Sequence, residues 1–180
     1  MSKVLVEPLI DGLVHGYAIQ AKKFSLELKI TNIDSSPSES FDISSVMLQS
    51  AEGQDIIENF QGRKFYVEKI NPGESKVISI GNNGQFMYGL VSVRISIKPE
   101  DTTKEILAVQ KNPFTNEHTD MLGPNMWVDF LYIKSAAQYS QEKSNKWLMR
   151  LTWVTAIFAF IQILPMLRKI SDFLIEHIWS

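Results

Sequence analysis

The segment from Arg150 to Lys169, RLTWVTAIFAFIQILPMLRK, constrains the fold most, because seventeen consecutive uncharged residues stand between its cations. As an α-helix these residues rise about 25 Å, which is short of a ~30 Å hydrocarbon core but within the ~17–25 residues that spans use. Trp147 to Met149 lengthen the apolar run, and Arg150 can extend its charged end toward the surface. The alternatives are a membrane span and the buried helix of a soluble protein or oligomer.

The distribution of the apolar residues favours the membrane span. They surround the helix instead of forming one stripe, and the β domain described below offers no second layer in which to bury such a helix. Tryptophans and cations near the ends of an apolar run are typical of membrane interfaces. We therefore predict a transmembrane helix over 147–169, anchored by Trp147, Arg150, Trp153, Arg168 and Lys169.

The charges beside this helix predict its orientation. The N-terminal flank has more cations than the C-terminal flank: Lys134, Lys143, Lys146 and Arg150 against Arg168 and Lys169. Because Lys and Arg concentrate on the cytoplasmic side of a span, we expect the N-terminal domain in the cytoplasm. The N-terminus also lacks the apolar core of a secretory signal, as expected of a tail-anchored protein. The tail 170–180 is predicted to be amphipathic, with these residues on its apolar side: Ile170, Phe173, Leu174, His177 and Ile178.

Small residues recur within the predicted span. Thr152 and Ala156 form one pair four residues apart, Thr155 and Ala159 form another, and Gln162 follows nearly one turn after Ala159. Small side chains let two helices approach closely, and an amide in lipid seeks a hydrogen-bond partner on another helix. This pattern makes a homo-oligomer that forms through the helix a reasonable hypothesis. The alternative is that Thr and Ala are simply tolerated in lipid.

The residues before the span are rich in period-two patterns. In FSLELKITN the apolar residues from Phe24 to Ile30 alternate with polar ones, and in LVSVRISIK those from Val91 to Ile97 do the same. Such alternation predicts half-buried β-strands. Further short strands are predicted at 45–50, 64–70, 75–81 and 106–110, separated by turn clusters at 34–40, 51–55, 71–75, 81–85 and 99–103. About seven short strands with frequent turns are typical of an antiparallel β-sandwich.

The predicted strands follow a recognisable order: the turn INPGES precedes one strand, and a Gly-rich turn then leads to the long alternating strand GLVSVRISIK. This order resembles the immunoglobulin-like modules of bacterial and archaeal proteins, such as CARDB-type domains. The resemblance covers residues 3–112 and implies an immunoglobulin-like β-sandwich over 1–112. The cysteine pair and the buried Trp of antibody-type domains are missing, since all four Trp follow residue 126. Because such folds carry many unrelated functions, the resemblance implies a fold and no particular activity.

The segment 113–146 is predicted to be a linker that is partly helical. Its first part belongs to the stretch KNPFTNEHTDMLGPN, which is rich in turn formers and has no apolar period. Residues 126–133 fit both an alternating strand and a helix. We favour a helix, because 134–146 contains no β-branched residue and places Glu142 four residues before Lys146.

No residue pattern in the chain indicates catalysis, a cofactor or a metal. Without Cys there is no disulfide and no thiol nucleophile, and a net charge of -2 gives no basic footprint for nucleic acid. Glu117, His118 and Asp120 lie close together, but no second His or Cys cluster completes a metal site. The glycines of GNNGQFMYG are followed by no phosphate-loop Lys, and no G-x-S-x-G motif occurs. We therefore expect a protein that is not an enzyme.

Two functional hypotheses follow. The first is a non-enzymatic adaptor that presents the β-sandwich at the cytosolic membrane face and binds a protein through a sheet edge or through the loops 34–40 and 81–87. Phe86, Met87 and Tyr88 stand at the end of the second loop, and for these three we favour the alternative that they begin the next strand and belong to the core. The alternative is a membrane-active effector or channel-like subunit, such as a defence protein, that uses Gln162, Pro165 and the amphipathic tail. An accessory subunit of a membrane complex would share the features of the adaptor. The sequence favours the adaptor.

Overall fold

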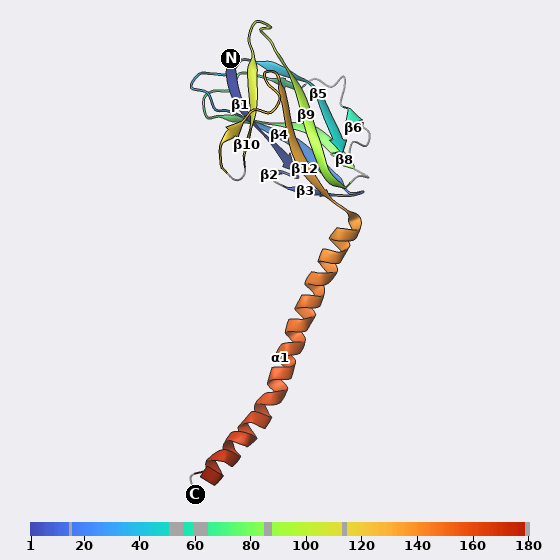
Figure 1. The fold of residues 1–180 in the computed structure, drawn as a ribbon, viewed down its shortest axis with the longest axis vertical. Coiled ribbons are helices and arrows are strands. Elements are labelled where there is room, and N and C mark those ends of the chain that lie inside the picture. The colour runs from blue at the N-terminus through green and yellow to red at the C-terminus, as the bar shows by residue number, and fades with distance from the viewer. Residues whose placement is uncertain (15, 51–55, 60–64, 85–87, 113–114, 179–180) are drawn as a thin grey trace. The chain divides into compact units, whose positions relative to one another are not determined.

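The computed structural model describes residues 1–14, 16–50, 56–59, 65–84, 88–112 and 115–178, and it describes the backbone alone for residues 56–59, 82–84, 170 and 173–178. The chain divides into two compact units, Met1–Ala136 and Ala137–Ser180. The first unit is a sandwich of two six-stranded sheets, and the second is helical (Figure 1). The predicted fold class, a β-sandwich followed by a helix, is confirmed.

Sheet A is built around the first strand of the chain. Its strand order is β11-β10-β1-β4-β8, and β2 pairs with the end of β1. Its strands are β1 (Ser2–Ile10), β2 (Leu13–Val14), β4 (Lys23–Asn32), β8 (Ser75–Gly84), β10 (Ile106–Lys111) and β11 (His118–Thr119). Pro8 fits within β1 because the ladder to β10 ends at Leu5 and the ladder to β2 begins at Leu9, so the missing N–H interrupts neither.

Sheet B faces sheet A across the core. Its strand order is β3-β12-β9-β5-β6, and β7 pairs with the beginning of β5. Its strands are β3 (Tyr17–Ile19), β5 (Phe41–Ser50), β6 (Ile56–Asn59), β7 (Phe65–Val67), β9 (Gly89–Pro99) and β12 (Met126–Lys134). The ladders from β9 to β5 and to β12 place β9 between two long strands, which explains its strong alternation.

The inward faces of the two sheets form one core. On β4, Phe24, Leu26, Leu28 and Ile30 are at most 4% exposed, and the corresponding residues of β9 are at most 5% exposed. Each such side chain stabilises the fold by about 1.5–3 kcal/mol when it is fully buried. The two strands predicted from strict alternation are therefore confirmed, and their apolar faces are the ones that meet in the core.

Most strand pairs are antiparallel, as predicted, but two are parallel. Ser2–Leu5 of β1 pair with Ile106–Val109 of β10, and Tyr17–Ile19 of β3 pair with Tyr132–Lys134 of β12. Both parallel pairs join strands far apart in the chain, which agrees with the long connection that a parallel pair requires.

The helix favoured over 126–133 is wrong, because these residues form β12. Eight consecutive register pairs join them to β9, from Met126 opposite Ser96 to Ile133 opposite Gly89. Trp127, Leu131 and Ile133 on the inward face are at most 5% exposed. Burial of this face and the ladder to β9 outweigh the helical pattern. The β unit therefore extends to Ala136, beyond the predicted boundary at 112, and the nine residues of β12 lie within the predicted linker 113–146.

The turn predicted at 81–85 is also wrong in its first four residues. Gly81–Gly84 continue β8 and pair with Lys23–Leu26 of β4. The register shifts between Leu26 and Glu27, and the backbone of Gly81 has a φ of 146°, which a residue with a Cβ rarely adopts. A bulge at a glycine thus lets a Gly- and Asn-rich segment continue the strand.

Helix α1 (Ala136–Ile178) contains 43 residues, about 65 Å at the usual rise of an α-helix. It begins after Ser135 with the sequence S-A-A-Q, a pattern typical of helix N-termini. The backbone N–H of Ala136 donates to the side-chain oxygen of Gln20, 3.2 Å away. The helix continues through Pro165, where the missing N–H removes one backbone hydrogen bond.

Candidate membrane anchor and interaction surface

Helix α1 carries the predicted span. Every residue from Trp147 to Lys169 is exposed within this chain, and the most apolar window of the helix has a mean hydropathy of 1.6 with no buried residue. A core helix of the sandwich would bury this surface in the chain itself. By length and composition, α1 is able to cross a membrane.

The predicted anchor residues all lie on α1. Arg150 precedes the uncharged run, and Arg168 and Lys169 follow it. Trp147 and Trp153 are 63% and 67% exposed, so both indole rings are available to a membrane interface. The fourth tryptophan, at position 179, lies outside the described residues.

The two threonines of the predicted association motif are hydrogen-bonded within their own helix. The Thr152 hydroxyl donates to the carbonyl oxygen of Leu148, and the Thr155 hydroxyl donates to that of Leu151, both at 2.9 Å. These hydroxyls are therefore satisfied within α1 without a second helix.

The small residues of the motif leave a shallow hollow on one side of α1. It is lined by Leu148, Leu151, Thr152, Thr155, Ala156 and Ala159. Gln162 continues the same helical face, and its amide has no side-chain hydrogen bond to any residue that the structure describes. The structure thus groups four predicted association residues, Thr152, Ala156, Ala159 and Gln162, on one face.

The amphipathic tail predicted over 170–180 is helical to Ile178. The side chains that would form its apolar side, including Phe173 and Leu174, lie outside the described residues. Ser171 and Asp172 are exposed.

A second surface lies on the outer face of sheet B. Tyr132 of β12 lies opposite Tyr17 of β3 on one side and Leu90 of β9 on the other, and Phe130 is the next outward residue along β12. These four residues, the apolar cluster, are 43–48% exposed. The Nζ atom of Lys134 lies 4.1 Å from the centre of the Tyr17 ring, a cation–π geometry that fixes one edge of the cluster.

The sequence did not single out the apolar cluster. Phe130 and Tyr132 were expected in a helix, Leu90 was the first residue of the predicted strand LVSVRISIK, and Tyr17 belonged to no predicted element. The alternation Met126, Val128, Phe130, Tyr132 was the available signal, because it gives β12 apolar residues on its outward face as well as its inward one.

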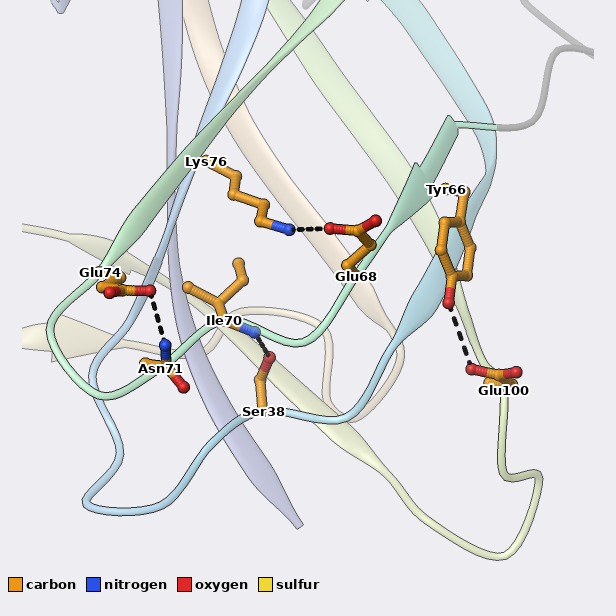
Figure 2. Close-up of polar contacts among 8 residues, drawn as sticks. All are labelled: Ser38, Tyr66, Glu68, Ile70, Asn71, Glu74, Lys76 and Glu100. Atoms are coloured by element: carbon orange, nitrogen blue, oxygen red, sulfur yellow. Dashed lines mark hydrogen bonds and ion pairs between the residues drawn. The ribbon is translucent and has the colours of Figure 1, made fainter.

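The predicted contact loop 34–40 is held in place at the end of the sandwich where β12 begins. The Ser38 hydroxyl accepts the N–H of Ile70 at 2.9 Å, and Lys76 lies 2.8 Å from Glu68 on the neighbouring segment (Figure 2). Tyr66 donates to Glu100 at 3.4 Å, close to where β9 ends (Figure 2). These contacts join the loops 33–40, 68–74 and 99–105 into one polar surface.

The ion pairs of this surface shift the pKa values of their members. Lys104 donates to Glu39 at 2.5 Å, which lowers the pKa of Glu39 and raises that of Lys104. Hydrogen bonds from the side chain and backbone of Thr103 lower the pKa of Asp101. The hydrogen bond from Lys76 likewise lowers the pKa of Glu68. In each of these three carboxyl groups, Glu39, Glu68 and Asp101, the hydrogen bond favours the charged form.

The second predicted contact loop, 81–87, is divided between a strand and residues that the structure does not describe. Residues 81–84 belong to β8, whereas Phe86 and Met87 lie outside the described residues. Tyr88 is 60% exposed, directly before β9.

The acidic and histidine residues at 117–120 have structural roles in and beside a β-hairpin. His118 lies in β11, which pairs with the end of β10, and the Asp120 carboxylate accepts the N–H groups of Leu122 and Gly123. Among the described residues, no three His, Cys, Asp or Glu side chains are grouped as metal ligands would be. His15 lies outside the described residues.

Comparison with known proteins adds structural neighbours. No family model and no curated protein matches the chain. The chain is similar to the crystal structure of the CARDB domain of the PF1109 protein from Pyrococcus furiosus in complex with di-metal ions, with 15% identity and a TM-score of 0.39 over 74% of this chain and 87% of that one. For the solution NMR structure of the same domain, identity is 14% and the TM-score 0.37 over 74% of this chain and 94% of that one. Both neighbours are of the CARDB type that the sequence resembles, while the sandwich assignment rests on the strand pairings described above.

Proposed function

We propose that this protein is a membrane-anchored, non-enzymatic adaptor that holds a β-sandwich at the cytosolic membrane face and binds a protein partner. The observation that carries the binding role is the apolar cluster of Tyr17, Leu90, Phe130 and Tyr132 on sheet B. The anchoring role is supported by the exposed apolar surface of α1, which its own chain leaves uncovered.

The chemistry of the apolar cluster suits a protein interface. Three of its four side chains are aromatic, and aromatic residues are enriched at interfaces because they bury a large area at a small cost in side-chain entropy. The four occupy adjoining register positions on three strands, so one partner side chain is able to contact several of them at once. Contiguous exposed apolar surface of this kind commonly marks a binding site.

The cytosolic orientation is supported by the charges beside the span. Lys143, Lys146 and Arg150 lie within eight residues on its N-terminal side, and Arg168 and Lys169 lie on the other. The larger number of cations on the N-terminal side favours a cytoplasmic location for the sandwich. The single acidic residue between Ala136 and Lys169 is Glu142, which changes this count little because acidic residues contribute little to orientation.

Site-specific photocrosslinking tests the binding role in cells that express the full chain. A photoreactive residue at Tyr132 is expected to yield a discrete adduct with a partner, and the same residue at Ser79 on the exposed face of β8 is the matched control. Phe130→Asp places a charge beside Tyr132 and is expected to abolish the adduct, whereas Phe130→Ala should weaken binding by about fivefold or more. An adduct that survives Phe130→Asp, or one that forms equally from Ser79, contradicts the proposal.

A second candidate function is a membrane-active effector or channel-like subunit. The observation that favours it is Gln162, a polar side chain without a described hydrogen-bond partner on the same face as the hollow in α1. Growth arrest on expression, lost when 147–180 are deleted and also lost in Gln162→Leu, would support the effector. A harmless full-length protein with a partner adduct at Tyr132 would support the adaptor.

A further inference from the structure

We propose that Lys143, Lys146 and Arg150 form a binding surface for the phosphate groups of anionic phospholipids in the leaflet at the N-terminal end of the span. This inference rests on the proposed anchoring of α1 in a membrane. It adds a lipid preference that anchoring alone does not require.

The three cations lie on one face of α1. They are separated by three and four residues, so at 3.6 residues per turn they fall within an arc of about 60°. All three are exposed, and none forms an ion pair with any residue that the structure describes. Trp147 and Trp153 flank this face on either side, so two interfacial aromatic rings border the cations.

The spacing along the helix matches the depth of the headgroup layer. Lys146 lies about 6 Å and Lys143 about 10 Å beyond Arg150 along the helix axis, on the side away from the apolar run. The polar layer on each side of a bilayer is about 5–8 Å thick, and side chains of this length reach several ångströms farther. With Arg150 at the edge of the hydrocarbon, the three cations therefore line the full depth of one headgroup layer.

The chemistry of the three side chains fits phosphate esters. The Arg150 guanidinium offers paired N–H donors to two phosphate oxygens, and the two ammonium groups add positive charge. The other end of the span lacks this arrangement, because Arg168 and Lys169 are adjacent and point about 100° apart, and Asp172 follows one turn later. The two ends of the apolar run thus differ both in the number of their cations and in how those cations are arranged around the helix.

Quenching of tryptophan by brominated lipid tests the proposal on the full chain. All measurements use a protein that carries Trp179→Phe. Trp127 is 2% exposed in the sandwich, so lipid does not reach it and the quenching reports on Trp147 and Trp153 near the proposed site. Two sets of vesicles contain the same mixture of phosphatidylglycerol and phosphatidylcholine, and only the lipid that carries bromine differs. We expect brominated phosphatidylglycerol to quench more strongly, with a local enrichment of about fivefold or more, since each cation near an anionic surface contributes about a fivefold preference.

Two matched variants assign the effect to the three cations. Lys143→Gln with Lys146→Gln keeps Arg150 at the edge of the span and is expected to reduce the enrichment several-fold. Arg168→Gln with Lys169→Gln removes the same charge from the other end and should leave the enrichment unchanged. Raising the salt concentration should weaken the enrichment, because exposed charges are screened.

The possible outcomes separate this proposal from the anchoring itself. If alkaline carbonate extracts the full chain from the vesicles, membrane anchoring fails. If the chain stays in the vesicles and both brominated lipids quench equally, anchoring stands and the lipid site is overturned. Enrichment that persists in the Lys143→Gln and Lys146→Gln variant, or that inorganic phosphate abolishes, also overturns the assignment to lipid headgroups at these residues.

Discussion

The side-chain amide of Asn32 donates to the backbone carbonyl of Ile70 at 2.8 Å, across 38 residues of sequence. The same amide donates to Ser36 at 2.8 Å, and its oxygen accepts the N–H of Asp34 at 2.9 Å. Asn32 is 0% exposed, so water cannot replace these bonds. One buried side chain thus fixes the chain beyond β4 to the segment before β8.

Asn32→Ala is expected to destabilise the sandwich by about 2–4 kcal/mol, because the three hydrogen bonds of a fully buried amide are lost. Residues 1–136 form a compact unit in which Trp127 is the one tryptophan, so urea unfolding of this fragment by fluorescence measures the change. Asn71→Ala is the matched control, since Asn71 donates to Glu74 at the exposed surface. Its cost should stay within about 0.5 kcal/mol. Equal costs for the two variants would contradict the role of Asn32.

Lys104→Met is expected to raise the pKa of Glu39 toward its ordinary value of 4.5, because the hydrogen bond from Lys104 is what lowers it. A carboxyl with a lowered pKa stabilises the folded state above its unfolded-state pKa and loses this contribution as the pH falls through its folded-state pKa. The stability difference between wild type and variant should therefore be present at neutral pH and vanish in acid. An NMR titration of Glu39 in both proteins checks the shift, and an unchanged Glu39 pKa would count against it.

Gly16→Ala is expected to cost about 1–3 kcal/mol, because the new Cβ would lie 2.8 Å from the carbonyl oxygen of Ile10 and 3.0 Å from its Cβ. The backbone oxygen belongs to the end of β1 and cannot turn aside. Gly12→Asn is the control, since Gly12 has a φ of 78°, which Asn tolerates, and nothing lies within 4 Å of its added Cβ. Thermal unfolding of both variants should rank Gly16→Ala well below Gly12→Asn, and the reverse order would contradict the clash.

Thr152→Leu with Ala156→Leu fills the hollow on α1, and we expect it to weaken helix–helix association by about 1–2 kcal/mol. Thr152→Val should leave association nearly unchanged, because the Thr152 hydroxyl already bonds to Leu148 within its own helix. Val154→Leu enlarges the opposite face and serves as the control. Energy transfer between labelled chains in bilayers measures each change. An association that the double variant leaves intact would remove the hollow as the contact.

Whether a strand could be predicted from the sequence depended on whether the residues on its outward face are polar or apolar. β4 and β9 place polar residues such as Glu27 and Arg94 on their outward faces, so their alternation was visible in the sequence. β1 was not singled out, because its outward residues Leu5 and Leu9 are also buried, at 8% and 6% exposure, which removes the contrast. β12 was misassigned for a related reason, since aromatic residues on its outward face left no polar alternation.

The candidate sites also differ in whether the sequence could predict them. The helix that is long and apolar enough to cross a membrane was predictable, because a long uncharged run with terminal cations depends on composition alone. The apolar cluster was not, because Tyr17 and Tyr132 are separated by more than a hundred residues and meet through a parallel pairing that no local pattern encodes. The Gly- and Asn-rich end of β8 was misassigned because intrinsic turn preference was outweighed by its ladder to β4.

Ser135 is the single residue between β12 and α1. The last residues of β12 are hydrogen-bonded to β3 on one side, and the strand is bonded to β9 on the other. A force applied to α1 would therefore enter the sandwich through a strand that is paired on both sides. Detaching β12 requires breaking its ladders to two neighbours, β3 and β9, whereas an edge strand would lose only one ladder.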